Sequence, residues 1–568
     1  MVERRRDALE RRWRRWEPVT LDQRFDTVAA AYPDRPCVID DARAYSYEEM
    51  AGWSRALARG LVSLGVQPGD RVALLMDNRP ELLAVKLAVS RVGAVAVPLN
   101  HQYRQGELLA ALGHVEASVL VTVARSMATD FLAALDGLAP GWEAGASVAA
   151  LPSLHHVVLV DPERPGAIDL SELARRGAQI PESVLATLAA QADPQGVSDI
   201  FFTSGTSGLP VAAELTHDMI LRSGYGSAYH RGFDDGRRLA FALPMYHVFG
   251  YVEGLMASLF VGGAIMPRRV FNPASMLEAV AREHAQEILL VPTMTVGLVE
   301  QAARGGYDLS SLESVTSAAS PAPTWLWERV VKDMGPKTVF TGYGQTEVSG
   351  GTTMTAPGDP LEVVAETVGA PKFGGIAAEG VAADGRLAQY RTVDPETGAP
   401  MPAGAPGELS VSGPIVTRAY HRDPERTARS ITDGWLRTGD MGWIDSSGYL
   451  HLTGRARELF KVGGELVAPK EVEDLLTRLP GVGQAYVAGI PDERLGEVGW
   501  AWVVPDGTAE LDERELIRYT RQHLAAFKVP RKVVFLDAKD LPLSGTGKVQ
   551  KFQLVATADH AATGRQAN

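Results

Sequence analysis

The sequence predicts an α/β protein with a large N-terminal domain, built from two helix-covered sheet subdomains and a small β subdomain, followed by a small α+β C-terminal domain. Three observations predict this. Strand-like apolar runs alternate with helical segments in the first half of the chain, Gly and Pro become frequent between about Thr367 and Tyr420, and a new pattern begins beyond Gly454. With 568 residues, the chain is also too long for a single core.

The alternation in the first half predicts parallel sheets covered by helices. The first series of expected strands comprises Arg71–Met76, Ala94–Leu99, Ser118–Thr122 and Val157–Val160. Between the first two of these lies an expected helix, Pro80–Val92. A second series comprises Leu239–Leu243, Ile288–Val291 and Thr338–Phe340.

The shorter apolar runs of the Gly- and Pro-rich region predict a small antiparallel β subdomain. The last part of the chain predicts helices at Pro469–Leu479 and Glu513–Ala525, with strands at Gln484–Gly489 and Gly499–Val504. This is a unit of about a hundred residues, a normal size for a domain. We expect domains at 1–454 and 459–568, with the boundary near Arg455–Glu458.

The composition excludes several classes of protein. The net charge of −13 argues against nucleic-acid binding, and no apolar stretch is long enough to span a bilayer. Cys37 is the only cysteine, so disulfides within the chain are impossible, which suits a reducing cytoplasm. The basic N-terminus is not a secretory signal. It predicts a helix whose Leu9, Trp13 and Trp16 pack on the body, or a basic amphipathic helix that rests on a membrane or a partner.

The loop Thr203–Pro210 is the most informative stretch of the sequence. It reads Thr-Ser-Gly-Thr-Ser-Gly-Leu-Pro and follows the apolar run Ile200–Phe202. Such a loop offers backbone N–H groups and hydroxyl groups to an anion. Taken alone, it is a phosphate-binding candidate or an ordinary turn.

Six further segments follow this loop in a characteristic order. They are Leu243–His247, Thr341–Glu347, Gly407–Leu409, Trp435–Asp440, Gly454–Glu458 with its continuation to Pro469–Glu473, and Pro542–Lys548. Together the seven motifs resemble the adenylate-forming superfamily of acyl-CoA synthetases, peptide-synthetase adenylation domains and firefly luciferases, over nearly the whole chain. The runs Glu458–Lys461 and Val467–Pro469 look most like the coumarate ligase and luciferase branch.

The resemblance implies an enzyme that works in two half-reactions. A carboxylate first attacks the α-phosphate of ATP and expels pyrophosphate, and a thiol, usually that of coenzyme A, then displaces AMP from the acyl-adenylate. The first step brings two anions together, so the site must supply positive charge and N–H donors. The implied cofactors are ATP and Mg²⁺, with coenzyme A as co-substrate, a small-molecule acid as substrate and no nucleic-acid partner.

The resemblance also implies roles for individual residues. The nucleotide is held by the phosphate loop, by the adenine-binding turn and by two residues near the ribose: Thr203, Ser204, Gly205, Thr206, Ser207, Gly208, Gly342, Tyr343, Gly344, Asp440 and Arg455. Lys548 is the catalytic lysine between carboxylate and α-phosphate, Thr346 bonds the α-phosphate, and Glu347 helps to hold Mg²⁺. The acid pocket includes Tyr246, His247, Ala318, Ala319 and Ser320, with His247 also implied in catalysis.

The last implied roles concern the second half-reaction. Arg457 and Glu458 match the hinge about which the mobile C-terminal domain turns. Lys461, Gly463 and Gly464 lie on the side of coenzyme A, where the two glycines leave room for the pantetheine arm. Taken alone, these residues also fit structural roles: a core tyrosine or histidine, an Asp that forms a turn, a solvated lysine. A nucleotide loop of the Walker type at Pro542–Lys548 is rejected, because Pro542 replaces the first glycine.

One departure leaves the chemistry open. The family loop continues Pro-Lys-Gly, whereas this chain has Pro210-Val211-Ala212. A lost charge-assisted hydrogen bond of about 1.5–3 kcal/mol weakens ATP binding about tenfold to a hundredfold. We therefore keep two alternatives to an acid–CoA ligase: an adenylating enzyme that loads a carrier protein or activates nitrite for diazotisation of an aryl amine, and a non-catalytic nucleotide-binding relative. The sequence names neither the acid nor the oligomeric state.

Overall fold

Close contacts divide the chain into two units. The computed structural model describes residues 1–568 except 127–128, 139, 145–149, 204–210, 380–383, 456–457, 463–464, 493, 545–547 and 564–568. The first unit comprises Met1–Ala365, Gly369–Gln389 and Ser412–Leu436, and the second comprises Glu366–Val368, Tyr390–Val411 and Arg437–Asn568. Because this division follows contacts and not motion, the expected domains 1–454 and 459–568 with a hinge between them stay a prediction.

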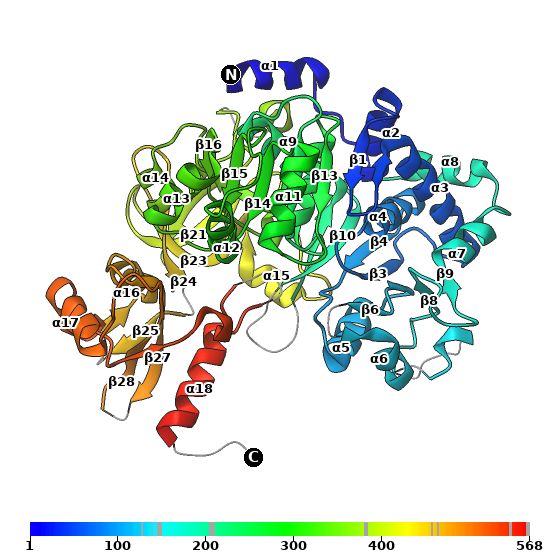
Figure 1. The fold of residues 1–568 in the computed structure, drawn as a ribbon. Coiled ribbons are helices and arrows are strands. Elements are labelled where there is room, and N and C mark those ends of the chain that lie inside the picture. Colours follow the sequence, from blue (N-terminus) through cyan, green and yellow to red (C-terminus); the bar gives the residue numbers. More distant parts are fainter. Residues whose placement is uncertain are drawn as a thin grey trace. The chain divides into compact units, whose positions relative to one another are not determined.

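A seven-stranded sheet lies in the first part of unit 1 (Figure 1). Its strand order is β11-β10-β4-β3-β5-β8-β9, and only β10 and β11 pair in antiparallel fashion. The strands are β3 (Arg71–Leu75), β4 (Val95–Pro98), β5 (Val119–Thr122), β8 (His156–Leu159), β9 (Ile168–Asp169), β10 (Val197–Thr203) and β11 (Val211–Thr216). The hairpin β10–β11 flanks the predicted phosphate loop.

A second seven-stranded sheet follows, with the order β16-β15-β14-β12-β13-β1-β2. All neighbours are parallel except β1 and β2. The strands are β1 (Pro36–Ile39), β2 (Ala44–Ser46), β12 (Arg238–Phe241), β13 (Ala264–Pro267), β14 (Glu287–Leu290), β15 (Ser314–Ser317) and β16 (Thr338–Phe340). Every predicted strand of both series lies within two residues of these bounds, so the prediction of two parallel sheets is confirmed.

Local capping explains where the helices of unit 1 begin and end. The Ser46 Oγ atom accepts the Glu49 N–H at 3.1 Å and the Glu49 carboxylate accepts the Ser46 N–H at 2.7 Å, a capping box that starts α3. Gly93, at φ 76°, ends α4 in the left-handed region. The helices are α1 (Val2–Arg12), α2 (Leu21–Ala31), α3 (Tyr47–Ser63), α4 (Pro80–Val92), α5 (Gln105–Val115), α6 (Phe131–Leu138), α7 (Leu170–Gly177), α8 (Glu182–Gln191), α9 (His217–Arg231), α10 (Ala257–Leu259), α11 (Pro273–Glu283), α12 (Pro292–Ala302), α13 (Thr324–Met334) and α15 (Pro424–Ser430).

Small antiparallel elements follow the second sheet. A three-stranded sheet contains β17 (Gly342–Gln345), β18 (Gly350–Met354) and β19 (Ala370–Pro371), and the 3-10 turn η3 (Thr346–Val348) joins the first two strands. The π-helix η2 (Phe249–Met256) precedes α10. Of these elements, β19 lies in the stretch Thr367–Tyr420, and its antiparallel pairing with β18, together with the strands Gln389–Val393 and Gly407–Ser412, agrees with the small β subdomain expected there.

Unit 2 contains two sheets, and the second of them is mixed, because its last strand pairs in parallel with its neighbour. The first joins β20 (Gln389–Val393), β21 (Gly407–Ser412), β23 (Trp435–Ile444) and β24 (Leu450–Arg455), and β22 (Ile431–Thr432) pairs with the start of β23. The second contains β25 (Phe460–Val462), β26 (Glu465–Val467), β27 (Val482–Asp492), β28 (Gly496–Pro505) and β29 (Lys532–Phe535), with α16 (Pro469–Leu476), α17 (Glu513–His523) and α18 (Lys551–Thr563). The predicted helices begin where expected, whereas both predicted strands are longer than expected.

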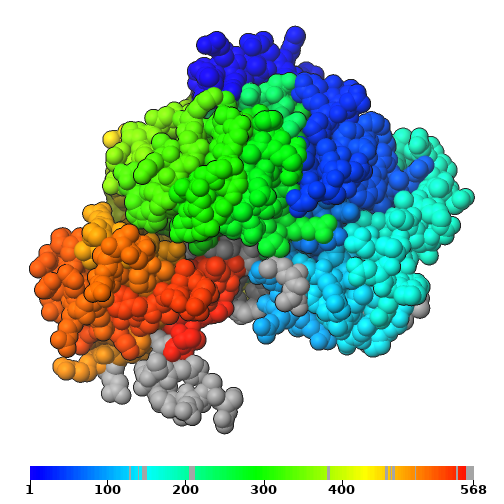
Figure 2. Space-filling model, viewed as in Figure 1, coloured from blue at the N-terminus to red at the C-terminus, as the bar shows by residue number. Residues whose placement is uncertain are grey.

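The N-terminal helix α1 packs on unit 1, which confirms the expected packing of its apolar side chains. Leu9 is 3% exposed. Farther along, the Trp13 indole N–H donates to the Phe260 carbonyl at 2.9 Å, and the Trp16 indole N–H donates to the Asp218 carboxylate at 2.7 Å. In the space-filling view, the dark blue residues of α1 lie on the surface of this unit (Figure 2). No described helix is long and apolar enough to cross a membrane.

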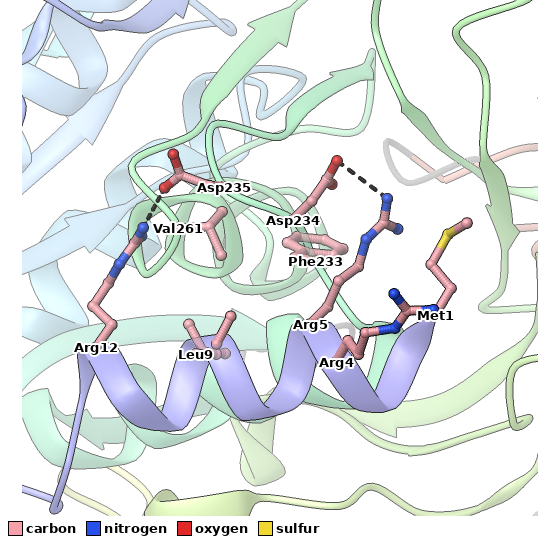
Figure 3. Close-up of a pocket in the computed structure, with 10 residues that line it drawn as sticks. Met1, Arg4, Arg5, Leu9, Arg12, Phe233, Asp234, Asp235 and Val261 are labelled. Carbon is pink, nitrogen blue, oxygen red and sulfur yellow. Dashed lines mark hydrogen bonds and ion pairs between the residues drawn. The ribbon is translucent and has the colours of Figure 1, made fainter.

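Ion pairs fix the polar side of α1. Arg12 pairs with Asp235, and Arg5 pairs with Asp234 at 3.3 Å and with Glu313 at 2.7 Å. Figure 3 shows Arg5 and Arg12 projecting from α1 toward Asp234 and Asp235, where they line a pocket of about 390 Å³ beside the helix. The pocket is lined by Met1, Arg4, Arg5, Ala8, Leu9, Arg12, Phe233, Asp234, Asp235 and Val261. It contains none of the predicted site residues.

The ion pairs of Glu313 allow a prediction of how the stability of unit 1 depends on pH in acid. Burial alone raises the pKa of Glu313, but hydrogen bonds from Arg5, Lys337 and Arg237 outweigh it and lower the pKa to about 2. Because the folded pKa lies below the unfolded value of about 4.3, the stabilisation is fully present above that value and is lost as pH falls toward 2. We expect Glu313→Gln to lower the melting temperature at pH 7 and to flatten its fall between pH 5 and 2, as measured by calorimetry. Parallel acid profiles for variant and wild type contradict the assignment.

Candidate active site

Three predicted pocket segments meet at one edge of the second sheet of unit 1. Strands β16, β15, β14 and β12 are adjacent and parallel, so their carboxyl ends share this edge. Tyr246 and His247 follow β12, Ala318–Ser320 follow β15, and Gly342–Gly344 follow β16. The topology therefore brings together residues that lie about a hundred positions apart in the chain.

A side chain from the first sheet holds the turn that carries Tyr246 and His247. The Asn78 Nδ2 group donates to the carbonyls of Leu243 at 2.8 Å and Arg268 at 3.1 Å, and Asn78 Oδ1 accepts the Met245 N–H at 2.8 Å. Asn78 is buried. Two of these hydrogen bonds hold the backbone immediately before Tyr246, and the third joins the same amide to the end of β13.

The two side chains of this turn have different polar environments. His247 Nδ1 accepts the Phe249 N–H at 3.2 Å, which assigns a proton to Nε2 in the neutral imidazole. Tyr246 packs edge-on against His101, with 5.1 Å between ring centroids. Burial raises the pKa of the Tyr246 hydroxyl well above its usual range, so it stays protonated. That hydroxyl has no hydrogen-bond partner among the described residues.

The backbone at the end of β15 is strained. Ala319 adopts φ 75°, in the left-handed region that favours glycine. Such a conformation costs about 1–3 kcal/mol and concentrates at functional sites. It places two small residues, Ala318 and Ala319, at the sheet edge where the predicted acid pocket lies.

The glycines around Tyr343 are required by the β17–β18 pairing. A Cβ atom on Gly342 would lie 2.4 Å from the Thr353 carbonyl oxygen, and one on Gly344 would lie 1.8 Å from the Gly350 oxygen. Only glycine permits these approaches. Tyr343 lies between them, half-buried, and its N–H donates to the Thr353 hydroxyl at 3.3 Å.

Thr346 and Glu347 follow in the turn η3, and both are buried. Glu347 Oε1 accepts the Tyr420 hydroxyl at 3.1 Å, and the Glu347 carbonyl accepts the Thr417 N–H at 2.6 Å. Burial and the neighbouring Glu347 carboxylate raise the pKa of Tyr420, so its hydroxyl stays a donor. Tyr420 was not among the predicted site residues, because the sequence identified it only as the end of the Gly- and Pro-rich region.

Val211, which stands where the family loop has a lysine, packs against a residue of unit 1 that is far away in the sequence. Val211, Ala213 and Tyr420 form a small buried apolar cluster, and the His421 N–H donates to the Ala212 carbonyl at 2.7 Å. The position where the family has a lysine therefore packs against the ring that holds Glu347. Thr203 ends β10 opposite Val211. The predicted loop residues Ser204, Gly205, Thr206, Ser207 and Gly208 lie outside the described residues.

In unit 2, the two predicted ribose residues are direct neighbours. Asp440 of β23 is the register partner of Arg455 of β24 in an antiparallel pair. The turn before Asp440 is held by Glu408, whose carboxylate accepts the Gly439 N–H at 3.0 Å and pairs with Arg437. These contacts explain why the Gly407–Leu409 motif contains a glutamate.

In unit 2, Lys548 is joined to Ser544 by two hydrogen bonds. Its N–H donates to the Ser544 hydroxyl at 3.1 Å, and its carbonyl accepts the Ser544 N–H at 2.7 Å. Three residues later, Lys551 pairs with Glu458 at 3.2 Å and with Glu473 at 2.6 Å.

The remaining predictions for the second half-reaction are only partly covered by the structure. Lys461 lies in β25, opposite Leu466. Arg457, Gly463 and Gly464 fall outside the described part of the chain. Within the described residues, no group of three or more His, Cys, Asp or Glu side chains forms a metal site, so Glu347 lacks a carboxylate cluster around it.

Comparison with known proteins identifies relatives along most of the chain. The AMP-binding enzyme family matches residues 25–421, and the AMP-binding enzyme C-terminal domain matches residues 471–548. A CoA ligase of Mycobacterium tuberculosis, named for a methyl-dioxo-octahydroindenyl propanoyl group, is 37% identical over 94% of this chain and 98% of its own. A feruloyl-CoA synthase of Amycolatopsis is 33% identical over 92% and 96%. The ATP-bound structure of MatB from Rhodopseudomonas palustris superposes with a TM-score of 0.79 and 28% identity, over 95% and 99%.

A substitution of Asn78 tests whether this side chain positions the turn of Tyr246 and His247. Asn78→Ala leaves the Leu243 carbonyl and the Met245 N–H without their hydrogen-bond partner. We therefore expect the free energy of unfolding to fall by about 2 kcal/mol or more. Because the turn carries Tyr246 and His247, we also expect KM for the acid to rise about tenfold while KM for ATP changes little. Steady-state kinetics and thermal unfolding measure the two effects.

The matched control is Asn272→Ala, which removes the N-cap of α11 and costs about 1 kcal/mol. This control is expected to lower the melting temperature and to leave both KM values unchanged. An Asn78→Ala enzyme that is less stable but has wild-type kinetics refutes the positioning role.

Proposed function

The chain belongs to the AMP-binding enzyme family, and we propose from this premise how its residues carry out the reaction of an ATP-dependent, AMP-forming acid–CoA ligase. The observation that carries the function is a likeness of 37% identity along 94% of the chain to a CoA ligase. The first half-reaction forms an acyl-adenylate and releases pyrophosphate, and the second transfers the acyl group to coenzyme A.

The first half-reaction must overcome the repulsion between a carboxylate and the α-phosphate of ATP. We assign this task to Lys548, whose ammonium group neutralises both as they approach. Thr346 donates its hydroxyl to the α-phosphate. The turn geometry supports this role, because η3 holds Thr346 beside Glu347 in a buried position.

Three sets of residues bind the nucleotide in this proposal. Tyr343 packs its ring against adenine. Asp440 accepts the ribose hydroxyls and Arg455 lies near the same sugar, which their pairing as register neighbours supports. The loop that begins at Thr203 and continues through Ser204, Gly205, Thr206, Ser207 and Gly208 binds the outer phosphates.

Mg²⁺ fits the single carboxylate of Glu347. This ion is usually held by one or two carboxylates together with substrate phosphates and water, so a cluster of acidic residues is not needed. The ion would supply positive charge to the phosphates. Tyr420 keeps one Glu347 oxygen in a fixed direction, at 3.1 Å.

The acid binds at the sheet edge formed after β12, β15 and β16. The small side chains of Ala318, Ala319 and Ser320 leave room for an aromatic or medium-chain acid. Tyr246 and His247 line the same edge, and the buried Tyr246 hydroxyl offers a donor. The names of the relatives support an acid that carries a ring.

In the second half-reaction, the C-terminal domain turns about Arg457 and Glu458 and removes Lys548 from the site. Lys461, Gly463 and Gly464 then face coenzyme A. We assign the enzyme to the cytoplasm, which its single buried cysteine, Cys37, suits. A carrier-protein thiol as acceptor, or nitrite with an aryl amine in place of the acid, remains the second proposal, because Val211 alters the phosphate loop.

The roles of the half-reactions are tested with Lys548→Ala. We expect acid-dependent pyrophosphate release to fall about a hundredfold to a thousandfold. Thioester formation from a preformed acyl-adenylate is expected to stay near the wild-type rate, because that step does not need Lys548. A screen of aryl, fatty and amino acids, with nitrite plus amines included, identifies the substrate.

Lys539→Ala serves as the control, since Lys539 is an exposed lysine of the same unit. It is expected to leave both half-reactions unchanged. Equal loss of both half-reactions in Lys548→Ala contradicts the assignment of Lys548. Pyrophosphate release without any thioester, over the whole acid panel, contradicts the ligase.

A further inference from the structure

A chain of alternating buried charges crosses unit 1. It begins at α1 and ends beside β18, and each member pairs with the next: Arg5, Glu313, Arg237, Glu287, Arg231, Glu253 and Lys372. The last five side chains are at most 3% exposed. The sequence analysis identified none of these residues.

Glu253 makes the contacts that matter for the site. Its Oε1 atom accepts the Lys372 ammonium and the Gly351 N–H, each at 2.9 Å, and its Oε2 atom accepts the Ser227 hydroxyl at 2.6 Å. Arg231 donates to the Glu253 carbonyl at 2.6 Å. Burial opposes the charge of Glu253, but Lys372 and Arg231 outweigh it and lower the pKa of the carboxyl.

The glycines opposite this carboxylate give independent support. A Cβ atom on Gly350 or Gly351 would lie 3.2 Å or 3.1 Å from Glu253 Oε1. Gly351 is also the register partner of Gly344, the glycine that follows Tyr343. A side chain at either position would therefore crowd the carboxylate.

A contribution to stability does not explain such a pair by itself. Desolvation of two buried charges offsets most of their attraction, and apolar side chains of similar volume are often as stabilising. Glu253 also lies in the π-helix η2, a conformation that is rare and often found at functional sites. The helix begins two residues after His247.

We propose that Glu253 is a positioning residue, which holds the β17–β18 hairpin through the Gly351 N–H and so fixes Tyr343 and Glu347 relative to the turn of His247. Lys372 neutralises the carboxylate so that it remains buried in this place. The proposal rests on the ligase function, because it assigns the nucleotide to the hairpin and the acid to the turn.

Two double variants separate positioning from burial of charge. Glu253→Gln with Lys372→Met removes both charges but keeps an oxygen that accepts the Gly351 N–H. Glu253→Met with Lys372→Met removes the charges and the acceptor. We expect the first double variant to keep acid-dependent ATP–pyrophosphate exchange within about threefold of wild type. The second double variant is expected to lose about tenfold or more in kcat/KM for this exchange, which corresponds to the loss of one buried hydrogen bond.

Hydrogen exchange gives a readout that does not depend on turnover. Peptides covering Gly350–Met354 are expected to lose protection in the second pair and to keep it in the first. Glu253→Asp keeps a charge for Lys372 but shortens the side chain, so it is expected to resemble the second pair. It serves as the second variant if the Met pair does not fold.

The control is Arg91→Met, which breaks the ion pair between the buried Arg91 of α4 and the more exposed Asp26 of α2. It is expected to lower the melting temperature without changing exchange kinetics or protection at Gly350–Met354. Wild-type kinetics and protection in the Met pair or in Glu253→Asp overturn the proposal. A wild-type enzyme that shows no acid-dependent exchange contradicts the ligase function instead, and the hydrogen-exchange comparison then still decides the role of Glu253.

Discussion

The parallel direction of β12, β14, β15 and β16 is the constraint on which the rest of unit 1 depends. Parallel strands end at a common edge, and in this class of fold the connecting helices cover the faces of the sheet and leave that edge to the loops. Segments with unrelated sequences are thereby brought to one place without any contact having to select them. The loops that follow these strands carry the residues that we propose to bind the acid and the adenine.

Buried polar groups fix the conformation of the loops, which the sheet alone does not determine. A sheet edge sets the neighbourhood of a loop, but the direction of a side chain depends on the backbone before it. Asn78 holds that backbone by two of its three hydrogen bonds, and Glu408 holds the turn before Asp440 by accepting the Gly439 N–H. Because an unpaired amide or carboxylate in these places is costly, each contact permits a narrow range of conformations.

Much of the fold was predictable from the sequence, whereas the supporting contacts were not. Apolar runs such as Val157–Val160 mark buried strands wherever they occur, and a Pro at its first position marks the start of α4. The partners of Asn78 and Glu253 lie far along the chain, 165 residues away for Leu243 and 119 for Lys372. No local pattern carries such pairings. The motif at Thr341–Glu347 was visible, but its glycines serve strand pairing as much as ligand approach.

The apolar cluster of Val211 and Tyr420 restricts which side chains position 211 can accept. A lysine in place of Val211 alone would bring an ammonium group into a buried apolar cluster that contains the ring whose hydroxyl binds Glu347. We therefore expect a lysine at position 211 to be tolerated only together with a change at Tyr420, so that the residues at these two positions depend on one another.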